Sequence, residues 1–292
     1  MSTQSPPAER AQPATEPATR RAPLAMRLLA GGRAALHGGL GEALWLFVTL
    51  RVVLSALAWT IARLAPMPET CDQAGYIPGH RQGLDLLLEG VWLRWDACWY
   101  EKVAAFGYQR GDPSVNFLPL FPWLQRAGGF VFGGNLTLSG LVVTGLAYIV
   151  ALTGLYRLIT RDFDEALARN TVLYISIFPT AFFFFAPFSE ALFLCLAVWA
   201  ILLAREERWG WVGALALLCG LVRVQGVVLA LPLAWEAFQQ WRAGRRRWLA
   251  WLAVTLAPLS FALLTLYTKL ATGTTTFETQ SVVWGNQLRW PW

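Results

Sequence analysis

Apolar residues fall in long blocks along this chain, with short polar stretches between them. A helix needs about 20 apolar residues to cross the ~30 Å hydrocarbon core of a bilayer. The pattern predicts about seven spans, over residues 43–64, 136–159, 171–186, 191–204, 210–222, 227–238 and 248–266. The fifth and sixth are halves of one apolar stretch that Arg223 and Gln225 interrupt. Broken helices of this kind are tolerated in membranes where they line a cavity.

The remaining segments differ in character. Residues 1–40 are rich in Pro, Ala and charge and predict a disordered cytoplasmic tail. Residues 41–267 form the predicted transmembrane core, within which residues 66–134 break the apolar pattern. Because so long an unstructured loop would be unusual, we expect a large helical loop lying along the membrane surface. Residues 268–292 predict a polar extracytoplasmic tail.

Composition narrows the class of protein. The 292 residues are 56% hydrophobic and only 14% charged, and the charged share is about half that of a typical globular domain. The sequence therefore predicts an all-α, multi-pass integral membrane protein. Its net charge of +6 lies mostly in the N-terminal segment and short loops, where it reports topology rather than nucleic-acid binding.

The placement of the arginine residues predicts which side of the membrane each segment faces. The N-terminal segment and the cluster at residues 242–247 are both Arg-rich, so both are expected on the cytoplasmic side, with an even number of crossings between them. The loop 66–134, the turn 187–190, the break 223–226 and the tail then fall together on the extracytoplasmic side, and the plasma membrane is the expected location. Cys71 and Cys98 share that loop, and the sequence leaves open whether they form a disulfide.

An acid among aromatic residues is the first candidate for chemistry. Asp96 follows Arg94 and Trp95 and precedes Trp99 and Tyr100. Desolvation raises the pKa of a carboxyl group and a nearby arginine lowers it, so such a group can act as a general base toward a hydroxyl. The alternative is an interfacial aspartate paired with Arg94 in an aromatic belt.

Two further charges interrupt apolar sequence. Glu190 can form a second wall of the same site, or can be an acid favoured at a helix N-terminus. Arg223 can contact a lipid phosphate, or can form a structural ion pair with a carboxylate such as Glu190. The loop also offers four residues that could bind a phosphate or be ordinary solvated surface: His80, Arg81, Lys102 and Arg110. The sequence has no metal-ligand spacing and no glycine-rich phosphate loop, so no cofactor and no metal ligands are predicted, and the sequence leaves a metal requirement open.

Four segments together resemble the PIG-V mannosyltransferase family. They are RWDACWY at residues 94–100 with AAFGY at 104–108, NFLPLFP at 116–122, FPTAFFF at 178–184 with APFSE at 186–190, and LVRVQG at 221–226. They occur in the family's order. Val222 departs from the family pattern, in which Thr or Ser often precedes the arginine.

The resemblance implies the GT-C class of membrane glycosyltransferases. Such enzymes take a sugar, here mannose, from a polyprenyl or dolichyl phosphate and transfer it with inversion to a glycolipid or glycan. By this resemblance Asp96 is the general base. The residues expected to bind substrate are Arg94, Trp95, Trp99, Tyr100, Glu190 and Arg223. Family members usually continue through further spans, so the tail is expected to be truncated.

Two other readings stay open. A transporter or lipid flippase would also use broken helices and charges within the bilayer, although it seldom needs a large ordered loop such as 66–134. A non-catalytic homologue is the second alternative, suggested by the short C-terminal segment.

Overall fold

The computed structural model describes residues 39–65, 71, 74–75, 85 and 88–283. Almost all of the predicted tail 1–40, together with His80 and Arg81, lies outside the described residues. Within them the chain is helical and has no strand. The elements are α2 (Gly39–Leu64), η2 (Gly90–Trp92), α4 (Asp96–Phe106), η3 (Pro113–Asn116), α5 (Leu120–Val131), α6 (Leu136–Asp162), α7 (Glu165–Ile177), η4 (Ala181–Phe184), α8 (Glu190–Arg205), α9 (Trp209–Gly220), η5 (Val224–Leu229), α10 (Ala230–Arg242), α11 (Trp248–Thr272) and α12 (Thr276–Val283).

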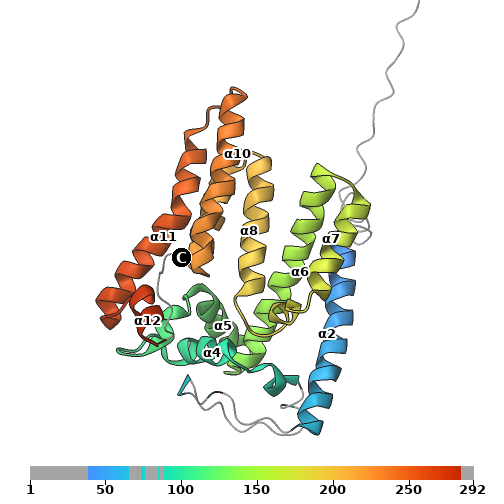
Figure 1. The fold of residues 1–292 in the computed structure, drawn as a ribbon, viewed down its shortest axis with the longest axis vertical. Coiled ribbons are helices and arrows are strands. Elements are labelled where there is room, and N and C mark those ends of the chain that lie inside the picture. Colours follow the sequence, from blue (N-terminus) through green and yellow to red (C-terminus); the bar gives the residue numbers. More distant parts are fainter. Residues whose placement is uncertain (1–38, 66–70, 72–73, 76–84, 86–87, 284–292) are drawn as a thin grey trace, which may run out of the picture.

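Long helices run along one axis of a bundle, and short helices lie at one end of it (Figure 1). Helices α2, α6 and α11 are long and apolar enough to cross a membrane. Helix α2 turns bulky apolar side chains outward, for example Val52, which is 63% exposed. Water-exposed surfaces rarely carry so many large apolar groups, whereas a lipid-facing helix requires them. The prediction of an all-helical chain with membrane-spanning helices is confirmed in this form.

Within the bundle itself, four of the described helices are shorter than a full span. Helices α7, α8, α9 and α10 have 13, 16, 12 and 13 residues, which is about 18–24 Å at 1.5 Å per residue. The prediction of a span over residues 171–186 is wrong in its boundaries, because α7 starts at Glu165 and ends at Ile177. Pro179 explains the stop: proline has no backbone N–H to donate, and Phe178 before it takes the extended ψ of 141° that a following proline favours.

The predicted interruption near Arg223 is a real break in the helix. Arg223 has φ −150° and ψ 149°, which is extended backbone between α9 and η5. Gly226 lies against Cys219 and Gly220 in the last turn of α9, and its backbone N–H donates to the carbonyl of Arg223 (2.9 Å). The arginine side chain is therefore presented from a non-helical segment rather than from a helix face.

Helix α6 forms the centre of the bundle. Tyr148 and Leu152 on α6 are fully buried. Glycines on the same helix admit large side chains from its neighbours, since a Cβ at Gly145 would lie 2.8 Å from the ring of Phe47 and one at Gly154 would lie 2.7 Å from Trp199. Small residues at helix contacts are how membrane helices approach closely.

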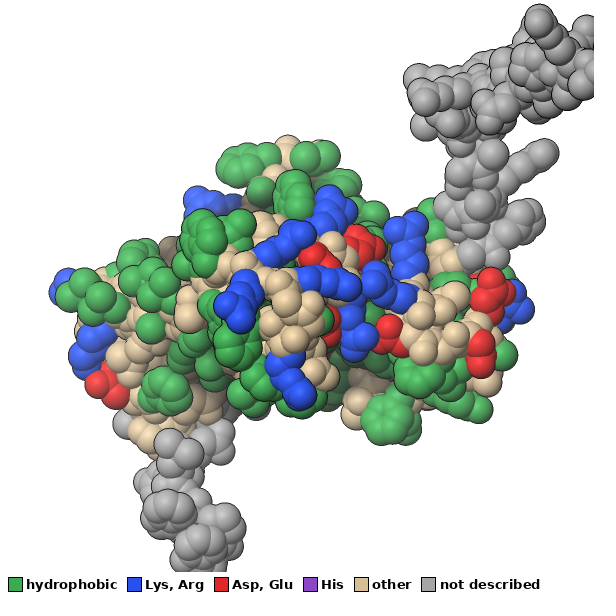
Figure 2. Space-filling model, turned by 90° about the horizontal axis from the view of Figure 1, so that it is seen from above, with side chains coloured by type: hydrophobic (Ala, Val, Ile, Leu, Met, Phe, Trp, Pro, Cys, Tyr) green, Lys and Arg blue, Asp and Glu red, His purple; other side chains and the backbone are tan. Residues whose placement is uncertain are grey.

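The two ends of the bundle differ in their side chains and in their helices. Figure 2 looks down on the upper end, where Lys and Arg side chains gather with a few acids. Arg205 there pairs with Asp162 (3.2 Å) and Glu236 (2.9 Å), and Arg247 pairs with Glu207 (3.0 Å). Helices α4, α5 and α12 lie at the other end (Figure 1). The Arg-rich turn at residues 242–247 is therefore separated in space from the described part of the loop 66–134, while the Arg-rich N-terminal segment lies outside the described residues.

Candidate functional site

Helix α4 begins at Asp96, the predicted base. The preceding residue, Trp95, has φ 48° and ψ −120°, a backbone conformation that non-glycine residues rarely adopt. Such strain persists only where the surroundings enforce it, and it is concentrated at functional sites. The Trp95 ring is 63% exposed and lies 5.9 Å from the ring of Phe182.

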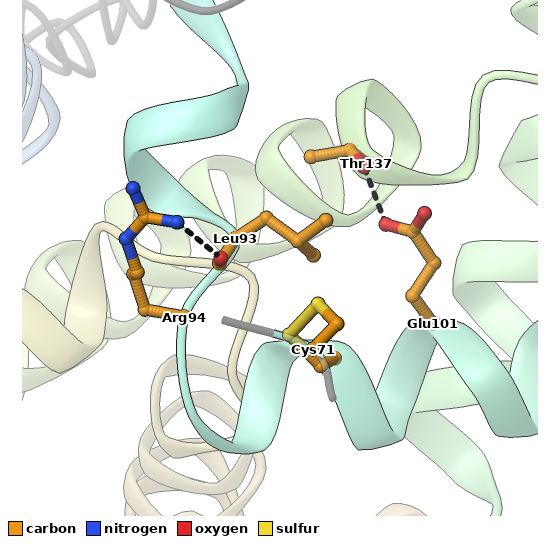
Figure 3. Close-up of a disulfide and its surroundings, with 6 residues drawn as sticks. Cys71, Leu93, Arg94, Glu101 and Thr137 are labelled. Carbon is orange, nitrogen blue, oxygen red and sulfur yellow. Dashed lines mark hydrogen bonds between the residues drawn. A yellow bond between two sulfur atoms is a disulfide. The ribbon is translucent and has the colours of Figure 1, made fainter. Parts of the chain in front are cut away.

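Three residues of α4 fix the helix in place through covalent or polar contacts. Cys98 forms a disulfide with Cys71, which settles the alternative that the sequence left open. Figure 3 shows this disulfide beside α4, with Glu101 reaching from the same helix toward Thr137. Lys102 forms an ion pair with Asp112 and donates to the carbonyl of Ala74 (2.7 Å). The residue at the start of α4 is thus held by a rigid helix.

Asp96 lines a polar pocket of about 290 Å³. Arg223 lines the same pocket from the break between α9 and η5, and Tyr100 lines it from the next turn of α4. Residues separated by more than a hundred positions in the sequence therefore meet at one site. The remaining lining residues are Asn116, Phe117, Leu118, Val222, Val224, Gln225 and Gln280.

Glu190 joins this site through Arg223. The Nη1 atom of Arg223 lies 2.5 Å from Oε1 of Glu190 and 3.1 Å from Oγ of Ser189. The hydroxyl groups of Tyr100 and Ser189 are 2.6 Å apart, so these contacts link α4, the start of α8 and the η5 break. Within the described residues, Oε2 of Glu190 is buried without a hydrogen-bond partner.

The surroundings of Asp96 shift the pKa of its carboxyl group. Burial raises the pKa of this carboxyl group above its ordinary value, the negative charge of Glu190 raises it further, and Arg223 offsets part of the effect. Asp96 is nonetheless an exposed residue, so its desolvation is partial and a proton can enter and leave. A carboxylate with a raised pKa is a better proton acceptor than an ordinary surface aspartate.

An apolar groove begins on the other side of Trp95. Its volume is about 410 Å³, and Arg94 and Trp95 line it together with residues of α2 and of the segment before α8. The other lining residues are Leu54, Leu57, Ala58, Ile61, Val91, Trp92, Pro179, Phe182, Ala186 and Phe188. Since α2 faces outward along most of its length, this groove lies where a lipid chain could enter from the bilayer.

The structure sorts the predicted site residues into three groups. Asp96, Tyr100, Glu190 and Arg223 come together around the polar pocket, while Arg94 and Trp95 line the apolar groove. Trp99 belongs to neither: it is 6% exposed and stacks on Phe117 with ring centroids 5.4 Å apart. Trp99 thus packs behind a residue of the pocket wall, Phe117, and its role in binding substrate stays a prediction.

The structure also describes two of the loop residues that the sequence offered as possible phosphate contacts, Lys102 and Arg110. Lys102 is committed to Asp112 and Ala74, whereas Arg110 is exposed and lines neither the polar pocket nor the apolar groove. Gln280 is a lining residue that the sequence did not indicate. Its position depends on how α12 folds back, which no local pattern encodes.

Replacement of Gly226 by alanine should lower the melting temperature of the protein in detergent. An added Cβ would lie 2.4 Å from the carbonyl oxygen and 2.6 Å from the carbonyl carbon of Cys219, which are backbone atoms that cannot move aside. We expect a cost of about 1–3 kcal/mol. Gly210→Ala is the matched control, because nothing lies within 4 Å of its Cβ. Equal melting temperatures for the two variants would contradict the packing described.

No three His, Cys, Asp or Glu side chains gather as metal ligands in the part of the chain that the structure describes. Comparisons of the chain with family models, curated proteins and solved structures give no match.

Proposed function

We propose that this chain is a membrane glycosyltransferase that moves mannose from a polyprenyl or dolichyl phosphate to a hydroxyl group of a glycolipid or glycan. The proposal includes the GT-C-like plan that the resemblance to PIG-V mannosyltransferases implies for this helical bundle, with inversion at the anomeric carbon. The donor is a substrate, and no cofactor or metal takes part in the proposal.

One observation carries this proposal. A polar pocket with a carboxylate and a guanidinium group, Asp96 and Arg223, lies beside an apolar groove, and the two are lined by consecutive residues of one segment. A lipid-linked sugar has the same two halves: a polar head and a long apolar chain. The groove accepts the chain, which places the sugar at the pocket.

The reaction needs a base. The acceptor hydroxyl attacks the anomeric carbon of the donor while the bond from that carbon to the phosphate oxygen breaks. The electron pair of the broken bond leaves with the phosphate, and the hydroxyl proton goes to the carboxylate of Asp96. A base positioned in this way contributes about 10²–10⁴-fold to the rate.

The leaving phosphate needs a positive charge more than a proton. Arg223 in the pocket and Arg94 in the groove lie on either side of the Trp95–Asp96 segment. A guanidinium group matches the geometry of a phosphate and keeps its charge in an apolar setting. Glu190 holds Arg223 in position until the donor arrives.

Two independent features favour an extracytoplasmic site. The Arg-rich turns at the upper end of the bundle belong on the cytoplasmic side by the positive-inside rule. The Cys71–Cys98 disulfide includes a residue of α4, the helix that begins with Asp96 at the opposite end of the bundle (Figure 1), and disulfides persist in oxidising compartments. These features support a pocket on the extracytoplasmic side, and the plasma membrane remains our expected location.

The test is an assay of sugar transfer by the purified protein in detergent, with no ion gradient present. Mass spectrometry should detect an acceptor enlarged by one hexose when polyprenyl-phosphate mannose is the donor. A protein that binds the donor but never forms this product would refute the proposal and favour a non-catalytic homologue. Movement of the intact lipid across vesicle membranes, without any transfer, would favour a flippase.

The pH dependence of transfer should follow the charges around Asp96. Activity requires the ionised carboxylate, so kcat/KM falls as the pH drops through the pKa of Asp96, at a midpoint above the ordinary value of about 3.9. Glu190→Gln removes a charge that raises this pKa, so the midpoint moves to lower pH. Arg223→Gln removes a charge that lowers it, so the midpoint moves to higher pH. Midpoints that shift in the same direction, or not at all, would contradict the assignment.

A further inference from the structure

Helix α12 brings a carboxamide to the polar pocket. Gln280 on α12 lines the pocket together with Asn116 at the end of η3 and Gln225 in η5. These residues come from three separate segments, and none of them carries a charge. The side-chain oxygen of Gln225 accepts from Nε of Arg223 (3.4 Å), so the carboxamides adjoin the charged residues of the pocket and add a second kind of chemistry to them.

Contacts with η3 and α11 hold α12 in position. Thr276 Oγ1 donates to the carbonyl of Val115 (3.0 Å), the residue before Asn116. Lys269 Nζ lies 2.7 Å from Oε1 of Glu278, and the rings of Phe261 and Phe277 meet edge to face at 5.8 Å. Gln280 is therefore held at the pocket from both α11 and η3.

From this geometry we infer that Asn116, Gln225 and Gln280 form a subsite for the hydroxyl groups of an uncharged sugar ring. A carboxamide offers two N–H donors and an acceptor oxygen. A sugar hydroxyl also donates and accepts, so the two groups pair in either direction. Charged side chains, in contrast, can only donate or only accept.

The size of the pocket agrees with one sugar ring. At about 290 Å³ it lies at the lower limit of small-molecule sites, which range from about 300 to 1,000 Å³. The lipid chain of the donor is assigned to the adjacent apolar groove instead. This inference rests on the proposed function for its role, since the ring belongs either to the donor mannose or to the acceptor.

The experiment measures binding and transfer separately. Methyl α-mannoside is titrated against the purified protein and followed by saturation-transfer NMR, with Gln225→Leu, Gln280→Leu and Gln280→Glu as variants. We expect each variant to weaken binding about threefold to tenfold, the factor that one neutral hydrogen bond supplies. Gln239→Leu is the matched control, because Gln239 is exposed near the end of α10, away from the pocket.

The outcomes separate the subsite from the proposed function. Unchanged affinity in the folded variants, or no binding of the mannoside by the wild type, would overturn the subsite. Binding that the variants weaken, in a protein that never transfers sugar, would support the subsite and refute the proposed function. In an active protein, a rise of KM for the donor alone assigns the ring to the donor mannose, and a rise for the acceptor alone assigns it to the acceptor.

Discussion

Replacing Asp96 by asparagine is expected to lower the rate of sugar transfer by about 10²–10⁴-fold. The amide has nearly the shape of the carboxylate but cannot take the proton of the acceptor hydroxyl. Because Asp96 lies in the pocket rather than in the apolar groove, the affinity for the donor lipid should change little. Initial rates with polyprenyl-phosphate mannose, together with donor binding, measure both quantities.

Asp85→Asn is the matched control for this variant. Asp85 is an exposed aspartate of the same loop and does not line the pocket, so the same chemical change there should leave the rate unaltered. A rate for Asp96→Asn within tenfold of the wild type would remove Asp96 as the base. Equal losses in both variants would point to a general effect on the loop.

Replacing Arg223 by glutamine is expected to reduce kcat by about 10²–10³-fold, the usual effect of removing one group that stabilises developing negative charge. The variant should also be less stable by about 1–3 kcal/mol, because Glu190 loses the partner at 2.5 Å. Thermal unfolding in detergent and the transfer assay report the two effects.

The double variant Arg223→Gln with Glu190→Gln separates the catalytic role of Arg223 from its role as the ion-pair partner of Glu190. Removal of both charges should restore most of the lost stability, since no unpaired carboxylate remains, while the rate stays low. Recovery of the rate along with the stability would mean that Arg223 serves only as a structural partner. Arg245→Gln, at the opposite end of the bundle and paired with Glu207, should leave the rate unchanged.

The apolar pattern of the sequence predicted most of the bundle because burial in lipid sets strict limits on length and polarity. The break at Arg223 could be predicted from the sequence because a charge inside an apolar run is costly in a membrane. The structure has extended backbone at this residue. The end of α7 was missed because Phe178 and residues 181–186 are as apolar as the helix before them. Only the backbone constraint of Pro179 stops the helix.

The candidate site was partly visible in the same way. Asp96, Glu190 and Arg223 stood out as charges in apolar or aromatic surroundings, and the structure brings them to one place. Trp99 was assigned to the site by its neighbours in sequence. However, consecutive residues of a helix point in different directions, so Tyr100 faces the pocket while Trp99 packs on Phe117. The strained backbone of Trp95 depends on tertiary contacts, and so does the position of Gln280 at the pocket. Neither feature can be predicted from the local sequence.

The most direct test of the account is an electron cryomicroscopy map of the protein bound to a non-hydrolysable polyprenyl-phosphonate mannose. The account predicts the isoprenoid chain in the groove beside α2, the phosphonate against Arg94 or Arg223, and the sugar ring in the pocket next to the Asp96 carboxylate. A sugar ring bound at the Arg-rich end of the bundle, or a polar pocket left empty beside a bound lipid, would contradict it.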